Sequence, residues 1–274
     1  MSIPAHDILA FIGGGNMASA LIGGLCKTGR AAGSILVIEP FEAQRQRLVA
    51  DFGVRTLASA DVTLAQASLV VWAVKPQLFA EAARPCAAHV AGALQLSVMA
   101  GIRSDAIARA TGSQRIVRSM PNTPALIGRG IAGLFATPAV TADERGLVEQ
   151  VLAPTGQTLW VPREADLDAV TALSGSGPAY VFYFVEAMVA AATEMGLTAE
   201  QGQRLALATF DGATALAAQS DESPAVLRER VTSKGGTTYA ALQSLRADAV
   251  GQAITKAVKA AQLRARELGD EFGG

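Results

Sequence analysis

Residues 7–18 read Asp-Ile-Leu-Ala-Phe-Ile-Gly-Gly-Gly-Asn-Met-Ala, which predicts a strand, a tight turn and the start of a helix. In this Gly-x-Gly-x-x-Ala pattern, Gly13 allows the turn, Gly15 lets the backbone approach a pyrophosphate, and Ala18 lets the helix lie close to the strand. The alternative is a glycine turn that binds nothing. Because the pattern directly follows the first strand, we expect a dinucleotide cofactor to contact Ile12, Gly13, Gly14, Gly15, Asn16 and Met17.

The first half of the chain continues as an alternation of short apolar runs and helical segments. Further strands are expected at residues 34–38, 69–74, 94–98, 116–119 and 158–161. The carboxyl ends of parallel strands form the crevice in which a dinucleotide lies. The residues that follow two of these strands are therefore predicted to bind the cofactor: Ala73, Val74, Lys75 and Pro76, together with Val98, Met99 and Ala100.

Two polar side chains near this crevice have more than one interpretation. Lys75 is expected to hydrogen-bond the nicotinamide ribose, although a lysine before a proline is also an ordinary solvated residue. Asn122 lies in a loop that two prolines stiffen, and it is expected to reach the nicotinamide or the substrate. The alternative for Asn122 is a simple Asx turn.

Glu39 follows the second expected strand, at the position where a dinucleotide fold places the residue that meets the adenosine ribose. A carboxylate there accepts hydrogen bonds from a free ribose hydroxyl and repels a 2′-phosphate, so the residue by itself favours NADH. Arg45 and Arg47 lie a little further along the next helix, where a contact with a phosphate would soften that repulsion. The cofactor is therefore expected to be NADPH or NADH, with the preference open.

The second half of the chain contains no convincing strand after residue 162. Helices are expected at residues 167–173, 179–195, 199–219, 224–231 and 237–268. Residues 1–162 are therefore predicted to form an α/β Rossmann-like NAD(P)-binding domain, and residues 163–274 an all-α dimerisation and substrate domain. Several of these helices are apolar on more than one side, which a single small bundle cannot bury, so we expect self-association as an intertwined dimer.

Residues 231–238, Val-Thr-Ser-Lys-Gly-Gly-Thr-Thr, place small hydroxyl and glycine residues immediately ahead of an amphipathic run. Glycines let backbone amides come close to a ligand, and Thr237 and Thr238 are expected to cap the helix that begins there. A helix start offers unpaired N–H groups and the positive end of a dipole, so a small carboxylate can dock at residues 235–238. The alternative is an ordinary loop with a good cap.

Composition excludes several classes of function. With a formal net charge of −1 and scattered basic residues, the chain is expected to have no positive potential that would attract nucleic acid or an anionic membrane. Cys26 and Cys86 are the only cysteines, so neither a disulfide framework nor a cysteine metal site is expected, and a reducing cytoplasm fits. His6 and His89 are expected to be solvated bystanders, which leaves a metal almost no ligands. The chain has no basic region before its first apolar run, so a soluble cytoplasmic protein without a signal peptide is expected.

Five motifs together resemble the pyrroline-5-carboxylate reductase family, and the resemblance covers nearly the whole chain. They are residues 13–18, Ala-Val-Lys-Pro at 73–76, Met-Pro-Asn-Thr-Pro at 120–124, Ser-Gly-Ser-Gly-Pro at 174–178, and residues 232–238. The resemblance implies a nucleotide domain followed by a helical domain that dimerises, with rings of dimers in some members. It also implies that 1-pyrroline-5-carboxylate binds at the loop containing Ser233, Gly235, Gly236, Thr237 and Thr238.

By the same resemblance, Thr238 hydrogen-bonds the ring nitrogen of the substrate, while Gly236, Thr237 and nearby amides hold its carboxylate. Thr238 is then the expected catalytic residue, because an imine hydrogen-bonded at nitrogen accepts hydride more readily and needs no histidine. The product would be L-proline. Two departures stand out: the family usually has proline where this chain has Lys234, and most members lack an acid at the position of Glu39.

Two other functions remain open from the residues alone. A hydroxyacid dehydrogenase of similar architecture would need a general base, for which Lys75 or Lys234 is available. The first long helix of the second domain lacks a lysine, which counts against that interpretation. A nucleotide-sensing protein without turnover is the other alternative, and it would bind cofactor tightly while reducing no imine.

Overall fold

The computed structural model describes residues 8–272, and an eight-stranded sheet organises its first part. The sheet order is β3-β2-β1-β4-β5-β6-β7-β8. Strands β1 to β6 are parallel to one another, β7 runs antiparallel to β6, and β8 is parallel to β7. The strands are β1 (Ile8–Ile12), β2 (Ile35–Ile38), β3 (Arg55–Leu57), β4 (Ala67–Trp72), β5 (Leu94–Ser97), β6 (Ile116–Met120), β7 (Gly130–Ala136) and β8 (Gly156–Trp160).

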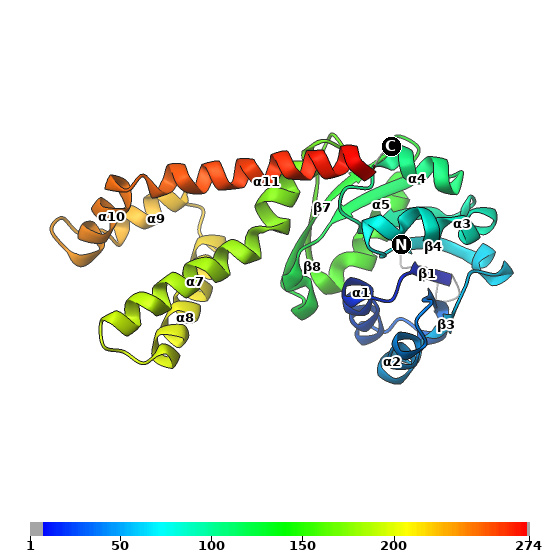
Figure 1. Cartoon of the computed structure of the whole chain (residues 1–274), viewed down its shortest axis with the longest axis horizontal. Helices are drawn as coiled ribbons and strands as arrows, with labels where there is room; N and C mark the ends of the chain where they lie inside the picture. The colour runs from blue at the N-terminus through cyan, green and yellow to red at the C-terminus, as the bar shows by residue number, and fades with distance from the viewer. Residues whose placement is uncertain (1–7, 273–274) are drawn as a thin grey trace. The chain divides into compact units, whose positions relative to one another are not determined.

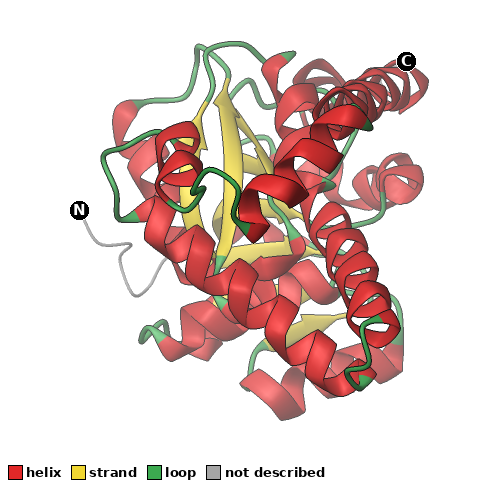
Figure 2. Cartoon of the chain, turned by 90° about the vertical axis from the view of Figure 1, so that its left-hand side faces the viewer, coloured by secondary structure: helices red, strands yellow, loops and turns green. Residues whose placement is uncertain are grey.

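Helices cover both faces of this sheet (Figure 2). Side chains of α1 (Asn16–Lys27), α2 (Glu42–Phe52) and α5 (Ala142–Leu152) share one core with Leu9 and Phe11 of β1. The other core joins Ala10 and Ile12 to α3 (Phe79–Val90) and α4 (Ser104–Thr111). Successive residues of β1 thus enter opposite cores, so its apolar run is continuous, as in a parallel strand buried on both faces. The expected Rossmann-like domain is confirmed.

Short helical turns connect several of these elements. The 3₁₀ turns are η1 (Ala32–Ser34), η2 (Val62–Gln66), η3 (Pro76–Leu78), η4 (Thr123–Ile127) and η5 (Ala153–Thr155), and η6 (Thr171–Gly175) is a π turn. The strands expected from the sequence are present, with ends shifted by one or two residues. Two strands were not expected: β3 is only three residues long, and β7 contains two glycines, Gly130 and Gly133.

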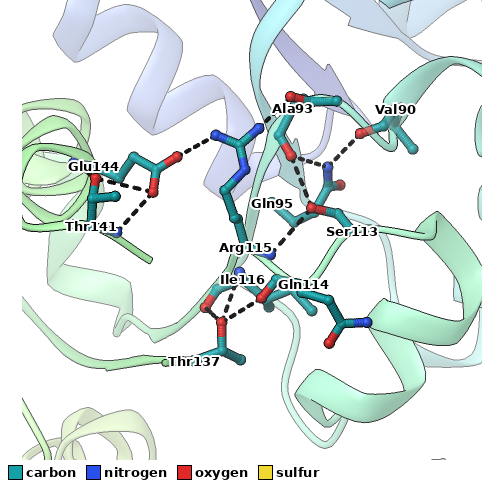
Figure 3. Close-up of polar contacts among 11 residues, drawn as sticks. Val90, Ala93, Gln95, Ser113, Gln114, Arg115, Ile116, Thr137, Thr141 and Glu144 are labelled. Atoms are coloured by element: carbon teal, nitrogen blue, oxygen red, sulfur yellow. Dashed lines mark hydrogen bonds and ion pairs between the residues drawn. The ribbon is translucent and has the colours of Figure 1, made fainter. Parts of the chain in front are cut away.

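Polar side chains close the edge of the sheet at which β5 and β6 begin (Figure 3). Gln95 donates from Nε2 to the carbonyls of Val90 and Ala93, at 2.8 and 2.9 Å. Arg115 donates from Nη1 to Glu144 Oε1 at 2.5 Å. The Ile116 N–H donates to Thr137 Oγ1 at 3.1 Å. These bonds join the segments around β5, β6 and β7 at this edge, whereas ligands of such parallel sheets bind at the opposite edge, where the strands end.

The described chain divides into two compact units, residues 8–176 with 261–272, and residues 177–260. No strand occurs between residues 163 and 272, as expected. The helices there are α6 (Asp166–Val170), α7 (Gly177–Glu194), α8 (Ala199–Ala218), α9 (Pro224–Arg230), α10 (Thr237–Ala247) and α11 (Val250–Phe272), and Figure 1 labels the five longer ones, α7 to α11. These two units reflect the contacts within a single chain. The domain boundary expected between residues 162 and 163 stays a prediction.

The single helix expected at residues 237–268 is wrong. The chain leaves the helical conformation at Asp248 and Ala249, and α11 then begins at Val250. Ala249 has φ +52°, the left-handed conformation that L residues with a Cβ rarely adopt. Neither residue of the break is a glycine or a proline, and Gly251 already lies inside the first turn of α11, so the helical pattern reads straight through the break.

The second compact unit, residues 177–260, leaves many apolar side chains exposed. Within α7, whose sequence is largely apolar, only Val185 and Ala192 are buried. Its exposed members include Phe182 at 59% and Tyr183 at 72%. Helices α7 and α8 pack against each other, which still leaves these rings uncovered. Exposed aromatic side chains gathered on one helix mark an interaction surface.

Candidate active site

The glycine-rich turn lies between β1 and α1, at the carboxyl edge of the sheet. Gly13 has φ +94°, and a Cβ there would lie 2.8 Å from the Ala73 carbonyl oxygen. The Gly13 N–H donates to the Ile38 carbonyl at 2.9 Å, and the Ala73 N–H donates to the Ile12 carbonyl at 2.8 Å. Only glycine fits at residue 13, and the backbone bonds bring the ends of β1, β2 and β4 together.

The residues of this turn fit a dinucleotide. Gly15 is exposed and caps α1, and a Cβ built on it would meet no atom within 4 Å. Gly15, Asn16 and Met17 form the start of α1, whose first turn carries no acidic residue. Ala18 is fully buried against the sheet, as the pattern predicts. Open space, unpaired helical N–H groups and the absence of an acid in that turn suit a pyrophosphate.

The other expected cofactor residues lie along the same edge. Ala73 and Val74 are half-buried, Lys75 is exposed, and Pro76 opens η3. The Val98 N–H donates to the Trp72 carbonyl at 3.0 Å, which holds the residues after β5 beside those after β4. Met99 is buried and Ala100 half-buried. The structure thus brings together the loops after β1, β2, β4 and β5.

The side chain of Asn122 forms a hydrogen bond within the protein. Its Oδ1 accepts from the Ile131 N–H at 3.0 Å, which ties the loop after β6 to β7. Its side chain makes no cap bond to η4, so the Asx-turn alternative does not describe it. Asn122 therefore orients the loop between two strands, and its contact with a nicotinamide or a substrate stays a prediction.

Glu39 holds the glycine-rich turn directly. It is only 7% exposed, and its carboxylate accepts from the Gly14 N–H at 2.9 Å and from the Phe41 N–H at 3.0 Å. Gln44, which the sequence did not single out, donates from Nε2 to the Gly14 carbonyl at 2.5 Å. Both polar groups of Gly14 are therefore bonded to side chains. No motif marks Gln44, because its role depends on where α2 lies relative to the turn.

The two arginines expected near the ribose are both engaged with the protein. Arg45 Nη1 donates to the backbone carbonyls of Glu39 and Pro40, at 2.9 and 2.7 Å. Arg47 forms an exposed ion pair with Asp51 at 3.5 Å. Arg45 thus stabilises the backbone that directly follows β2, at Glu39 and Pro40.

The loop expected to bind substrate forms a tight turn into α10. The Gly236 N–H donates to the Ser233 carbonyl at 3.0 Å, and Gly235 has φ +78°. Because no residue with a side chain has a positive φ except Ala249 among residues 8–272, Lys234 has a negative φ. This combination is a type II turn with Lys234 at its second position and Gly235 at its third.

Thr237 and Thr238 were expected to cap α10, and this expectation is wrong. The cap is Gly236, which makes no side-chain cap bond, and the two threonines are the first helical residues. As such, their N–H groups have no acceptor within the helix. The Gly236 N–H is occupied by the turn, so the helical amides available to a carboxylate start at Thr237. Thr238 is half-buried and Thr237 exposed.

Between residues 8 and 272, no three His, Cys, Asp or Glu side chains lie close enough together to hold a metal ion. Over the same range, no helix combines the length and the apolar character that a membrane crossing requires.

Burial raises the pKa of the Cys86 thiol to about 11 and also raises that of Cys26. His6 lies outside the described residues, and His89 is in the last turn of α3.

Comparisons with known proteins agree with this architecture. Residues 164–268 match the family model for pyrroline-5-carboxylate reductase dimerisation. Residues 8–101 match the model for NADP oxidoreductase, coenzyme F420-dependent. The pyrroline-5-carboxylate reductase of Pseudomonas aeruginosa is 41% identical, over 97% of this chain and 98% of its own length.

Solved structures give the same result. The pyrroline-5-carboxylate reductase of Coxiella burnetii is 34% identical, with a TM-score of 0.90 over 96% of this chain and 98% of its own. The Plasmodium falciparum pyrroline carboxylate reductase, solved with NADP bound, is 26% identical, with a TM-score of 0.85 over 97% of this chain and 99% of its own. With identity of about 40% along the whole length, a glycine-rich cofactor turn and a matching dimerisation region, the chain belongs to the pyrroline-5-carboxylate reductase family.

Proposed function

We propose that this chain performs its family's reaction through the two loops described above. When bound, a reduced nicotinamide cofactor supplies hydride to the cyclic imine 1-pyrroline-5-carboxylate, which becomes L-proline. The observation that carries this function is the full-length identity of 41% to a pyrroline-5-carboxylate reductase. The chain is thereby an NAD(P)H-dependent oxidoreductase of proline biosynthesis.

On the cofactor side, Gly15, Asn16 and Met17 would hold the pyrophosphate with their backbone N–H groups. Ile12, Gly13, Gly14, Ala73, Val74 and Pro76 would form the wall of the crevice, with Val98, Met99 and Ala100 beside them. Lys75 is exposed at this edge, where its ammonium can hydrogen-bond a ribose. Asn122 would reach the nicotinamide end with its side-chain amide. The bonds from Glu39 and Gln44 to Gly14 keep the turn in place before the ligand arrives.

On the substrate side, the N–H groups of Thr237 and Thr238 would bind the carboxylate at the start of α10. Gly235 and Gly236 give the turn its shape, and the Ser233 hydroxyl lies beside Gly236. The Thr238 hydroxyl would hydrogen-bond the ring nitrogen, which gains a proton as the imine becomes an amine. These groups position and polarise the imine, so no histidine is needed.

The cofactor is NADPH or NADH, and we propose that Glu39 shifts the preference toward NADH. Glu39 is buried at the end of β2, where its negative charge would face a 2′-phosphate. We also propose a dimer, or a ring of dimers, working in the cytoplasm.

The deciding experiment measures the oxidation of NADPH and NADH, in parallel, with 1-pyrroline-5-carboxylate as acceptor and a 2-keto acid as control. Turnover with the imine alone, and formation of proline, would support the proposal. Turnover with the keto acid alone would favour the hydroxyacid dehydrogenase with Lys75 or Lys234 as its base. Tight cofactor binding without any turnover would favour the sensing protein.

A further inference from the structure

We propose that the C-terminal turn, residues 268–272 at the end of α11, positions the cofactor loop, residues 98–103 between β5 and α4. Arg103 and Asp270 would act as positioning residues for cofactor binding. The inference rests on the proposed function, because that function makes Val98, Met99 and Ala100 cofactor contacts. Residues 98–103 and 268–272 belong to the same compact unit.

Backbone packing is the first observation. Gly101 has φ +76°, and a Cβ there would lie 3.3 Å from the Leu268 carbonyl oxygen and 3.2 Å from the Phe272 ring. Phe272 also packs against the sheet core that contains Met99. The C-terminal turn therefore lies directly on the cofactor loop at Gly101, and a side chain at residue 101 would crowd this contact.

An ion pair fastens the same contact. Arg103 Nη2 lies 2.5 Å from Asp270 Oδ1. The guanidinium crosses Gly269, where a Cβ would lie 3.2 Å from both Nε and Nη2 of Arg103. Gly269 is buried, although it lies close to the end of the chain. The absence of a side chain at residue 269 is what lets the arginine reach Asp270.

The two ends of the cofactor loop are held independently of the C-terminal turn. At its start, the Met99 N–H donates to Ser97 Oγ at 3.3 Å. At its end, Ser104 donates to Glu164 from its N–H at 2.7 Å and from its hydroxyl at 2.6 Å. In the middle of the loop, Ile102 is buried in the sheet core, while its neighbours Gly101 and Arg103 make the contacts with the C-terminal turn described above.

The test compares Asp270→Asn with Glu271→Gln in the full-length enzyme. Glu271 lies on the same turn but pairs with Arg264. It is the matched control for loss of one carboxylate. We expect Asp270→Asn to raise the KM and the dissociation constant of NADPH and NADH about two- to fivefold, which is the range for a half-exposed ion pair. The kcat and the KM for the imine should stay within about twofold, and Glu271→Gln should match the wild type.

Two further variants make the result decisive. Phe272→Ala removes the ring that covers Gly101 and should raise the cofactor dissociation constant as well. The charge exchange Arg103→Asp with Asp270→Arg should restore part of the affinity that Asp270→Asn loses. Wild-type affinity in both Asp270→Asn and Phe272→Ala would overturn the inference, as would equal losses in Asp270→Asn and Glu271→Gln. An inactive wild type would overturn the proposed function instead, and the dissociation constants would still test the loop.

Discussion

At the scale of single residues, Glu39 combines two tasks. Its carboxylate accepts hydrogen bonds from the Gly14 and Phe41 N–H groups, and the same charge lies at the strand end where a dinucleotide fold places the ribose. A serine there would remove the charge and both bonds. The residue thus links the shape of the glycine-rich turn to the choice between cofactors.

Glu39→Ser is therefore expected to change affinity and preference together. Loss of the bonds to the turn should raise the KM of both cofactors. Loss of repulsion should raise the ratio of kcat/KM for NADPH to that for NADH by roughly tenfold, or about 1.4 kcal/mol. Asp51→Asn, which neutralises an exposed acid on α2, is the control for net charge. An unchanged ratio in Glu39→Ser would mean that its carboxylate does not face the ribose.

Thr238→Ala is expected to lower kcat by roughly 100-fold, the usual cost of one hydrogen bond that stabilises the reacting group. The cofactor dissociation constant should stay near the wild-type value, since this side chain is assigned to the substrate. Thr237→Ala removes an exposed hydroxyl one residue earlier while keeping the backbone N–H, so it should lose much less. Equal losses in the two variants would remove the Thr238 hydroxyl from the mechanism.

At the scale of elements, the strands that could be predicted from the sequence are those whose burial leaves a clear apolar pattern. The parallel strands were recognised because they are buried on both faces and read as continuous apolar runs, as in Leu69–Trp72. β7 was missed because Gly133 breaks its pattern. A Cβ at Gly133 would lie 2.6 Å from Val170, so that glycine exists to admit α6.

The candidate site shows the same limit. The glycine-rich turn and the turn before α10 were found because their chemistry lies in consecutive residues. Gln44 was missed, since its bond to Gly14 joins residues thirty positions apart. The capping role expected of Thr237 and Thr238 was wrong because Gly236 takes that place. The break at Ala249 was missed because the residue with positive φ is an alanine, and Gly251, two residues later, is the nearest glycine.

The turn before α10 gives a prediction at this scale. Lys234 occupies the second position of a type II turn, which proline favours because its φ is already set. Lys234→Pro should raise the midpoint of thermal unfolding by about 1–3 °C, mainly by restricting the unfolded chain. The KM for the imine should stay within about twofold, because in the proposed site backbone amides hold the carboxylate. Lys234→Ala is the control, and a large rise in KM for both variants would assign the ammonium to the substrate.

At the scale of the whole molecule, the exposed apolar side chains of residues 177–260 require a partner. Residues 164–268 match a dimerisation region, and Phe182 and Tyr183 of α7 are mostly exposed in one chain. A second copy of this chain is the partner that the family match indicates. Burial of these two rings would contribute several kcal/mol to association, since a fully buried aromatic side chain is worth about 2–3 kcal/mol.

The double variant Phe182→Glu with Tyr183→Glu should therefore dissociate the protein, because two carboxylates would have to be buried in an apolar interface. Sedimentation velocity should show a shift toward the monomer, with a fall in imine reduction at the same protein concentration. Val62→Glu is the control, since Val62 is 73% exposed in the nucleotide-binding part of the chain and belongs to no such surface. If the double variant sediments like the wild type while Val62→Glu does too, α7 lies outside the interface and the association must use other helices of residues 177–260.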